Sequence, residues 1–437
     1  MMRFAQTSQV GNNGQYDCVM TKSESPTATD LDGLSICLVG INYAPDSTGI
    51  APYTQAMAKA FRDASAEVHV VTGVPHYPQW TVRDAKYSHG SRWDEIIDGI
   101  EVTRVSHHVP AQPDFFGRGR MEASFLARAA PVVRADRSDI VVAVTPSLAS
   151  LGAARYGRRS RPLGVVVQDL TGNAAGESGT TGARAARAIA AVEYRWLRAA
   201  QRIGVITPQF ATALIEHGID PAAIVDLPNF THITPVTASR SEARSRLGWR
   251  HEMFAVVHTG NMGMKQGLEN VIEAARYSEK HHSGVHFMLV GDGNQRTILE
   301  SSGAGVSTLT FIDPLSSDDY PYALAAADTL LLNERPGVKE MSLPSKLTSY
   351  TSASRPIIAS VEPDGITHGV IAQDDAALLV APGDASALVA GALRLKEDKS
   401  LAKTYAAKAL AMHEARYAPA GAKARYVAFA DSLRSAI

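Results

Sequence analysis

The sequence Glu340-Met-Ser-Leu-Pro-Ser-Lys-Leu-Thr-Ser-Tyr-Thr-Ser-Ala-Ser-Arg-Pro-Ile-Ile-Ala-Ser360 decides the fold of the second half of this 437-residue chain. Pro344 suits the first turn of a helix, where its missing N–H costs no hydrogen bond. Arg355 precedes a proline, which disfavours the helical conformation and ends the helix there. The apolar run 357–359 then has the composition of a buried strand. The stretch therefore predicts a loop, a short helix and a strand, in the order expected of an α/β domain.

The start of this helix is suited to bind an anion. Ser345 and Lys346 fall in its first turn, where backbone N–H groups are unpaired and the helix dipole is positive. Glu340 lies on the loop before it and is a candidate to accept hydrogen bonds from a ligand. An ordinary loop-to-helix turn without a ligand has the same features. The stretch alone leaves both interpretations open.

The first half of the chain alternates between buried strands and amphipathic helices. Residues 34–41 form a continuous apolar run, which is typical of a parallel strand buried on both faces. A loop follows, Pro52 opens a helix, and residues 68–72 give the next strand, so the order is that of a βαβ unit. Further strands are expected at 140–144, 163–168, 203–206 and 224–227.

The alternation lapses at residues 231–249, which have the composition of a linker followed by a short helix. It then restarts with strands expected at 254–259, 285–290, 308–311, 329–332 and 357–359, and with helices from 385 onwards. We therefore predict an α/β protein of two Rossmann-like, doubly wound domains that face a central cleft. The expected division is a disordered polar tail at 1–32, an N-terminal domain at 33–235, a C-terminal domain at 236–415, and a last helix at 416–437 that packs back toward the N-terminal domain.

Composition excludes several classes of function. The formal net charge is −1 at pH 7, which gives no reason to expect nucleic acid as a partner. The two cysteines make no disulfide framework, and no His/Cys cluster has metal-ligand spacing, so we expect no metal and a reducing compartment. The sequence contains neither an apolar run of membrane-spanning length nor the apolar core of a signal peptide. A cytoplasmic protein is expected, with peripheral contact to a membrane left open.

Arginines recur between the strands of the first domain. Solvated helix faces explain them most simply, and a basic surface that docks on anionic lipid headgroups is the alternative. The residues are Arg118, Arg120, Arg128, Arg134, Arg155, Arg158, Arg159, Arg161, Arg184, Arg187, Arg195, Arg198 and Arg202.

Loops rich in glycine and polar residues follow several strands. In open α/β sheets ligands bind at the carboxyl ends of the strands, so these loops are candidate site elements. One is Asp46-Ser-Thr-Gly49, and a second is 260–267, where Lys265 is the only cation. Small residues, a cation and a helix start suit a diphosphate. Neither loop matches a P-loop or a G-x-G-x-x-G fingerprint.

Two further residues are candidates from their positions. Asp169 ends a predicted strand, and an ordinary role as a helix cap is the alternative. His76 lies in the loop Pro75-His-Tyr-Pro78, where a histidine that only packs the loop is the simpler interpretation.

Several of these segments, in this order and spacing, resemble the GT-B glycosyltransferases of family 4, and most of all its colanic-acid-type exopolysaccharide branch. The resemblance covers nearly the whole chain after the N-terminal tail. The segments that carry it are 42–54, 73–78, 168–170, 228–229, 260–261, 265–268, 291–293, 344–350 and 355–360.

The resemblance implies a hexosyltransferase that moves a sugar from a nucleotide-diphosphate donor to a saccharide acceptor, without a cofactor or metal and with retention at the anomeric carbon. It places the donor on the second domain and the acceptor on the first. In the cytoplasm, an arginine-rich first domain fits an acceptor carried on a polyprenyl diphosphate at the inner face of the plasma membrane.

The family's motif assigns roles to residues of this chain. Its first glutamate, which contacts the sugar, corresponds to Glu340, whereas the second, which contacts the ribose, falls on Ser349, one residue further away than the motif has it. The family's Gly-Arg phosphate loop reads Gly260-Asn261 here, which makes Lys265 the expected phosphate clamp. The resemblance implies catalytic roles for Glu340, Lys265, Asp169 and His76, and donor binding by Gly49, Gly260, Asn261, Lys265, Gly291, Glu340, Pro344, Ser345, Lys346 and Ser349.

Two other functions share this architecture. A nucleotide-sugar epimerase would react with the donor alone, without an acceptor. A non-catalytic nucleotide-sugar-binding protein, suggested by Ser349 in place of a glutamate, would bind donor without turnover.

Overall fold

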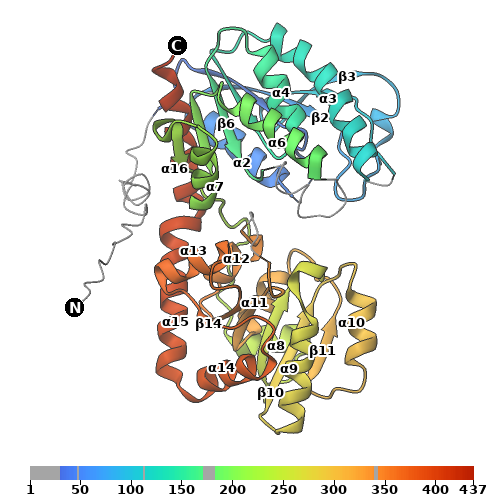
Figure 1. Cartoon of the computed structure of the whole chain (residues 1–437), viewed down its shortest axis with the longest axis vertical. Coiled ribbons are helices and arrows are strands. Elements are labelled where there is room, and N and C mark those ends of the chain that lie inside the picture. The colour runs from blue at the N-terminus through green and yellow to red at the C-terminus, as the bar shows by residue number, and fades with distance from the viewer. Residues whose placement is uncertain (1–29, 47–48, 112–113, 171–182, 339–342) are drawn as a thin grey trace, which may run out of the picture. The chain divides into compact units, whose positions relative to one another are not determined.

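The computed structural model describes residues 30–46, 49–111, 114–170, 183–338 and 343–437 (Figure 1). Nearly all of the predicted polar tail, and the candidate Glu340, lie outside the described residues. The chain divides into two compact units. Unit 1 comprises residues 1–228 and 423–437, and unit 2 comprises residues 229–422. The sequence analysis placed these boundaries at 235 and 415.

Unit 1 is built on an eight-stranded sheet with the order β3-β4-β2-β1-β5-β6-β7-β8 among the described residues. Every neighbouring pair is parallel except the edge pair β3–β4. The strands are β1 Ser35–Val39, β2 Glu67–Gly73, β3 Arg92–Ile97, β4 Ile100–Val105, β5 Ile140–Val144, β6 Leu163–Val167, β7 Arg202–Val205 and β8 Ile224–Asp226.

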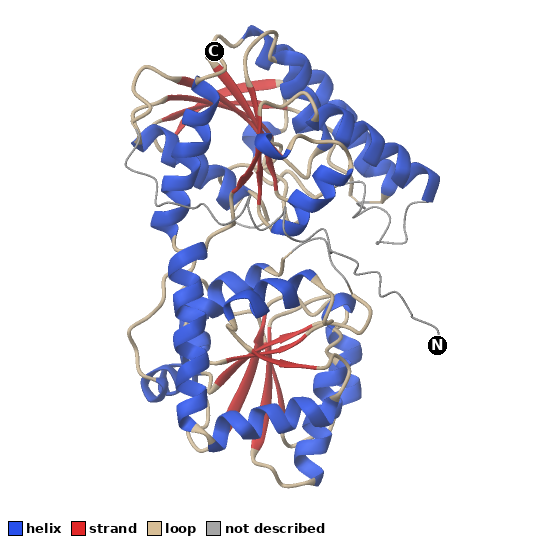
Figure 2. Ribbon diagram, turned by 60° about the vertical axis from the view of Figure 1, so that its left-hand side comes forward, coloured by secondary structure: helices blue, strands red, loops and turns tan. Residues whose placement is uncertain are grey.

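Helices cover both faces of this sheet (Figure 2). They are α2 Ala51–Asp63, α3 Phe115–Ala135, α4 Leu148–Gly157, α6 Ala183–Leu197, α7 Pro208–Glu216 and α16 Pro419–Arg434, with short turns η2 Ala85–Tyr87 and η3 Pro221–Ala223. Central strands such as β5 and β6 are buried along their whole length, because helices remove both faces from water. The parallel register brings the carboxyl ends of the strands to one edge, where the candidate loops emerge.

The hairpin of β3 and β4 is a feature that the sequence analysis missed. Its turn is Asp98-Gly99, and both residues have positive φ, 51° and 75°. An Asp-Gly pair favours this two-residue turn because glycine adopts positive φ without strain. The turn signal was therefore present in the sequence, but the alternation of strands and helices in the rest of the domain predicts parallel pairs and gives no sign of an antiparallel edge.

The C-terminal residues 423–437 belong to unit 1. The Lys423 ammonium lies 2.9 Å from the Asp63 carboxylate of α2. A Cβ on Gly164 of β6 would come within 2.7 Å of Leu433 and 3.0 Å of Phe429. The end of α16 therefore packs directly on the sheet of unit 1, because Gly164 has no side chain to block this contact.

Unit 2 is built on a six-stranded parallel sheet, again among the described residues, with the order β11-β10-β9-β12-β13-β14. The strands are β9 Phe254–Thr259, β10 Val285–Val290, β11 Leu309–Ile312, β12 Thr329–Asn333, β13 Ile357–Ser360 and β14 Leu378–Val380. The helices are α8 Arg240–Leu247, η4 Met264–Gln266, α9 Glu269–Lys280, α10 Arg296–Gly303, α11 Tyr320–Ala326, α12 Ser345–Ser352, α13 Ile366–Asp374, α14 Ala385–Glu397, α15 Lys399–Met412 and the π-helical turn η5 His413–Tyr417. Two hydrophobic clusters, one on each face of this sheet, form its core.

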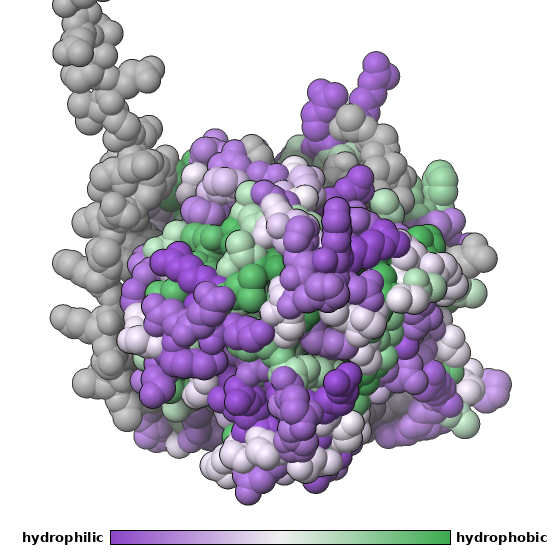
Figure 3. Space-filling view, turned by 90° about the horizontal axis from the view of Figure 1, so that it is seen from below, coloured by the Kyte–Doolittle hydropathy of each residue, from purple (hydrophilic) through white to green (hydrophobic). Residues whose placement is uncertain are grey.

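Among the described residues, no helix combines the length and the apolar character that crossing a bilayer requires. The face drawn in Figure 3 is mostly hydrophilic, and hydrophobic residues gather on it in separate groups between polar side chains.

Candidate active site

Two glycine loops of unit 2 meet backbone to backbone at the carboxyl ends of β9 and β10. Gly260 N–H donates to the carbonyl of Val290 over 2.8 Å. A Cβ on Gly291 would lie 2.1 Å from the Gly260 carbonyl oxygen, and the φ of Gly291 is 136°. Only glycine allows this approach. The predicted candidates Gly260 and Gly291 are therefore brought together.

The β9 loop is held in shape by its own hydrogen bonds. Met262 N–H donates to the Asp292 carbonyl over 2.8 Å, and Gly263 N–H donates to the Gln266 side chain over 3.1 Å. The Asn261 side chain is exposed and lies against Gly263 and Gly293, where a Cβ would meet it at 2.8 and 2.6 Å. The sequence-predicted Asn261 thus sits at the same junction as the two glycines.

Lys265 lies on the short turn η4 that follows this loop. Its carbonyl accepts the N–H of Arg335 over 2.9 Å, so its backbone is anchored, while its side chain is exposed. A lysine in this position offers a compact positive charge beside the glycine junction.

Lys346, in the first turn of α12, is directed to the same junction. Its ammonium lies 3.1 Å from Nε2 of His258, and a Cβ on Gly260 would come within 4.0 Å of its Cε. Complete burial, and secondly the Lys346 charge, lower the pKa of His258 well below its usual value. His258 is therefore neutral at pH 7, and its Nε2 accepts a hydrogen bond from the ammonium. The sequence analysis missed His258, since a histidine inside an apolar strand gives no signal of its own.

Ser345 begins α12, and Pro344, which occupies the N-cap position, makes no side-chain hydrogen bond to the helix. The first N–H groups of a helix have no acceptor one turn earlier within the helix, so we expect this end of α12 to present donors to a ligand. Six of the predicted donor-binding residues therefore lie close together in unit 2, at the carboxyl ends of β9 and β10 and at the start of α12. They are Gly260, Asn261, Gly291, Pro344, Ser345 and Lys346.

Ser349 is buried, with only 4% of its area exposed. Its hydroxyl donates to the Lys346 carbonyl over 3.0 Å and lies 3.3 Å from the Tyr320 hydroxyl. Tyr320 in turn lies 3.0 Å from the Thr259 hydroxyl, so this network ties α12 to the end of β9. The expected ribose contact of Ser349 stays a prediction.

In unit 1, His76 is buried at the carboxyl edge of the sheet. Its Nδ1 lies 2.9 Å from the Val74 carbonyl, and its ring packs edge-on against Trp80 and His107 at 5.8 and 4.8 Å between centroids. These contacts fix the orientation of the ring. The sequence analysis missed His107, whose pKa is lowered to about 4 by burial first and by His76 second.

The β1–α2 loop meets the His76 loop. A Cβ on Gly49, where φ is 64°, would lie 3.0 Å from the Tyr77 ring. Burial raises the pKa of Asp46, although hydrogen bonds from Asn42 and the Tyr77 backbone oppose that rise. Gly49 and His76 therefore belong to one loop cluster, with Asp46 as a partly desolvated carboxylate beside them.

Asp169 follows β6 at the same edge of the sheet. Its carboxylate accepts the N–H of Leu170 over 2.8 Å, and its carbonyl accepts the Thr145 hydroxyl over 3.1 Å. Because residues 171–182 lie outside the described part, the predicted helix cap stays untested.

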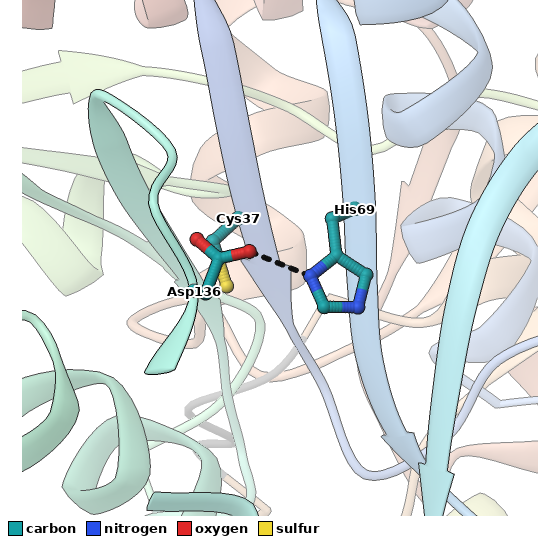
Figure 4. A group of neighbouring side chains, drawn as sticks. All are labelled: Cys37, His69 and Asp136. Atoms are coloured by element: carbon teal, nitrogen blue, oxygen red, sulfur yellow. Dashed lines mark hydrogen bonds and ion pairs between the residues drawn. The ribbon is translucent and has the colours of Figure 1, made fainter. Parts of the chain in front are cut away.

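One group of potential metal ligands occurs among the described residues, formed by Cys37, His69 and Asp136 (Figure 4). These three are far apart in sequence, so ligand spacing could not reveal them. Asp136 accepts from His69 over 2.7 Å and from Arg161 over 2.8 Å, and burial raises the pKa of Cys37 well above its usual value. An ion would have to displace an arginine and bind a thiol that resists ionisation, so we interpret the group as an internal hydrogen-bond network.

Comparison with known proteins identifies the class to which these sites belong. Residues 48–229 match the family described as Glycosyl transferase 4-like domain, and residues 254–398 match Glycosyl transferases group 1. The two matches lie one in each unit and together cover most of the chain. The chain belongs to the family 4 type of GT-B glycosyltransferases and is a glycosyltransferase.

Among individual relatives, the chain is 29% identical over 398 residues to the putative colanic acid biosynthesis glycosyl transferase WcaI of Escherichia coli, covering 86% of this chain and 96% of that protein. It is 25% identical over 187 residues to the probable glycosyltransferase WbjE of Pseudomonas aeruginosa, covering 39% of this chain and 45% of that protein. Among solved structures, Anabaena HepE in complex with UDP-glucose superposes with a TM-score of 0.65 at 18% identity, covering 92% of this chain and 100% of that chain. Sucrose-phosphate synthase from Thermosynechococcus elongatus superposes with a TM-score of 0.65 at 16% identity, covering 89% of this chain and 96% of that chain. These structures confirm the predicted GT-B fold.

Proposed function

We propose that this glycosyltransferase moves a sugar from a nucleoside-diphosphate donor, bound by unit 2, to a saccharide acceptor, bound by unit 1. The acceptor in this proposal is linked to a polyprenyl diphosphate, and the product is an exopolysaccharide or cell-surface glycan. The name of the Escherichia coli relative supports the pathway class, and the UDP-glucose complex of HepE supports the donor class.

The observation that carries the proposal is the position of Lys346. Its ammonium is held by neutral His258 beside the glycine junction of unit 2, where the N-terminus of α12 also offers N–H donors. When the bond between the anomeric carbon and the diphosphate breaks, the departing diphosphate gains negative charge. This negative charge is stabilised by the ammonium groups of Lys346 and Lys265 and by the backbone N–H donors. In this proposal the departing diphosphate is thus stabilised electrostatically without a metal ion. Glu340 is proposed to accept hydrogen bonds from the sugar hydroxyls.

On the acceptor side, we assign His76 and Asp169 to the loops that receive the acceptor hydroxyl. His76 supports this role because its ring orientation is fixed by Val74 and by two aromatic neighbours. The hydroxyl oxygen bonds to the anomeric carbon as the bond between that carbon and the diphosphate breaks, and the departing diphosphate takes up the hydroxyl proton. Retention of the anomeric configuration is part of the proposal, and nuclear magnetic resonance of the isolated product reads it directly.

The proposal is tested by release of nucleoside diphosphate from UDP-, GDP-, ADP- and dTDP-sugars. The assay compares reactions with and without a polyprenyl-diphosphate-linked saccharide, and repeats them in chelator. We expect release to depend on the acceptor and to persist in chelator. Conversion of the donor alone to an isomeric sugar would support the epimerase alternative. Donor binding without turnover under any acceptor would support the non-catalytic alternative.

A further inference from the structure

A fully buried arginine lies between the two loops that are proposed to receive the acceptor. Arg104 is on β4, and 0% of its area is exposed. Its guanidinium donates to the carbonyl of Ala44 and, over 3.1 Å, to the carbonyl of Gly73. Ala44 lies on the β1–α2 loop shortly before Asp46, and Gly73 ends β2 shortly before His76. One side chain therefore joins the bases of the β1–α2 loop and the His76 loop.

Further contacts place this arginine at the centre of the acceptor side. The Gly73 N–H and the Thr72 hydroxyl both donate to the carbonyl of Ile41, over 3.1 and 3.2 Å, so the two loops are also joined by hydrogen bonds of their own. Burial raises the pKa of Asp46, and the Arg104 charge is among the groups that oppose this rise. The guanidinium is therefore close enough for its charge to act on this carboxylate.

The edge hairpin of the sheet supplies the partner of the arginine. Glu95 of β3 lies opposite Val102 of β4, so Arg104, two residues further along, is its diagonal neighbour on the same face. One oxygen of the Glu95 carboxylate lies 3.1 Å from Nε of Arg104. The other accepts from the Lys86 ammonium over 2.8 Å and from the Tyr87 hydroxyl over 2.7 Å. Burial opposes ionisation of Glu95, yet these partners hold its pKa below its usual value. The hairpin and η2 therefore fix the orientation of the guanidinium.

Stability alone does not explain an arginine at this position. Removing a guanidinium from water is costly, and apolar side chains of similar volume often replace buried ion pairs without loss of stability. An arginine differs from an apolar side chain, and from a lysine, in its planar fork, whose N–H groups point in fixed directions. Here the fork reaches three acceptors, namely the Ala44 and Gly73 carbonyls and the Glu95 carboxylate. Such an arrangement sets the distance between two loops and does more than fill space.

We infer that Arg104 is a positioning residue for the acceptor. By holding Ala44 and Gly73, it keeps Asp46 and His76 at a fixed separation, so that an acceptor hydroxyl meets both loops at once. Because it is fully buried, the arginine acts through these loops and not by touching substrate. The inference rests on the proposed function in placing the acceptor at these loops.

The first measurement is hydrogen exchange of the full chain without substrate, followed by mass spectrometry of its peptides. Arg104→Lys keeps the charge and removes the fork. We expect the amides of Asp46 and Gly73, which are hydrogen-bonded within the two loops, to exchange at least about tenfold faster, the effect of one lost charge-assisted hydrogen bond on local opening. No acceptor is present, so this result tests the positioning of the loops independently of the proposed function.

The matched control is Arg161→Lys in the same unit. Arg161 is also largely buried, donates to the carbonyls of Gly157 and Arg158 over 3.2 and 3.0 Å, and pairs with Asp136. It precedes β6 and therefore lies at the amino ends of the strands, away from the acceptor loops. We expect this variant to lower the melting temperature as Arg104→Lys does, and to leave exchange in both loops unchanged.

The second measurement separates positioning from a loss of folded protein. In the acceptor-dependent assay, Arg104→Lys is expected to raise the KM for the acceptor at least about tenfold, since a displacement of about 1 Å within a site costs up to about 100-fold. The dissociation constant of the nucleoside diphosphate, which unit 2 is proposed to bind, is expected to stay as in wild type. A variant that is merely unfolded in part has a lower apparent kcat and an unchanged KM.

Glu95→Gln is a second variant, which decides the inference should Arg104→Lys fail to fold. It leaves the arginine in place and preserves the volume of its partner, but it removes the charge that orients the fork. We expect the same changes in exchange and in acceptor KM, in smaller size. Unchanged exchange in either loop, equal changes in the Arg161→Lys control, or an acceptor KM that neither variant alters would each overturn the inference.

Discussion

The ammonium of Lys346 and Nε2 of His258 lie 3.1 Å apart, one at the start of α12 and the other near the end of β9. Burial keeps the imidazole neutral, so it orients the lysine without competing for its charge. The pair gives unit 2 a fixed cation at the glycine junction. In the proposed function, His258 is therefore a positioning residue and Lys346 is the residue proposed to contact the diphosphate.

Lys346→Ala is expected to weaken binding of the cognate nucleoside diphosphate by roughly 10- to 100-fold, as loss of a charged hydrogen bond costs about 1.5–3 kcal/mol. His258→Leu is expected to weaken it less, because the ammonium remains but loses its orientation. In the double variant the two losses should be non-additive by about 1 kcal/mol. Titration calorimetry measures the dissociation constant of the nucleoside diphosphate for wild type, the two single variants and the double variant. Strictly additive losses would contradict a positioning role for His258.

Gly291→Ala is expected to disrupt the glycine junction. Its Cβ would lie 2.1 Å from the Gly260 carbonyl oxygen, and the φ of 136° is strained for alanine. We expect a loss of at least about 3 kcal/mol in the free energy of unfolding, measured in urea. Gly305→Ala is the matched control, since its φ of 81° is also positive but nothing lies within 4 Å of the added Cβ. Its expected loss is about 1 kcal/mol, from backbone strain alone. Equal losses would show that the close approach is not what requires glycine.

Asp328→Ala is expected to destabilise unit 2 strongly. The Asp328 carboxylate lies 2.6 Å from the guanidinium of Arg244 and accepts the N–H of Ala255 over 2.7 Å. Arg244 is only 1% exposed, so removing its partner leaves a buried charge unpaired. The expected loss is about 3–5 kcal/mol. Arg276 and Glu273 form an exposed ion pair within α9 of the same unit, and Glu273→Ala is expected to cost under about 1 kcal/mol. A similar cost for both would contradict the role assigned to burial.

Protonation of His107 is expected to make unit 1 less stable in acid. Its pKa is about 4 in the folded protein and about 6.5 in the unfolded chain, so the unfolded state binds the extra proton first as pH falls. Stability is therefore full above about pH 6.5 and decreases as the pH falls towards 4, by up to about 3 kcal/mol from this group. His107→Gln should flatten the pH dependence of the unfolding free energy over that window. An unchanged slope in the variant would contradict a buried, neutral His107.

The sequence predicted most of the fold, because buried parallel strands are continuous apolar runs. The predicted strands at 140–144, 254–259 and 285–290 coincide with β5, β9 and β10. The hairpin β3–β4 was not predicted, because its edge strand alternates between exposed and half-buried residues and lacks the continuous apolar run of a buried strand. Its only local signal is the two-residue turn Asp98-Gly99.

The candidate site was predicted less completely. Glycines and lysines in loops after strands are visible in a sequence, and Gly260, Gly291 and Lys346 do come together in unit 2. His258 and His107 were missed, since each acquires its importance from burial and from neighbours distant in sequence. A motif position gave Ser349 a ligand role, and the structure shows its hydroxyl in an internal hydrogen-bond network, so its contact with a ribose stays a prediction.

The central claim is that unit 2 binds the diphosphate of a sugar donor through its lysines. The most direct test is the change in melting temperature of wild type, Lys265→Ala and the control Lys403→Ala with UDP, GDP, ADP and dTDP. Lys403 is exposed on α15, one turn after Lys399, whose ammonium lies over the Phe254 ring at the opposite end of β9 from the glycine junction, so its loss should have no effect on binding. A ligand at about 100 times its dissociation constant stabilises the native state by about 2.7 kcal/mol. We predict that one diphosphate raises the melting temperature of wild type and Lys403→Ala, and that Lys265→Ala loses most of that rise. No stabilisation by any of the four, or an equal rise in all three proteins, would contradict the claim.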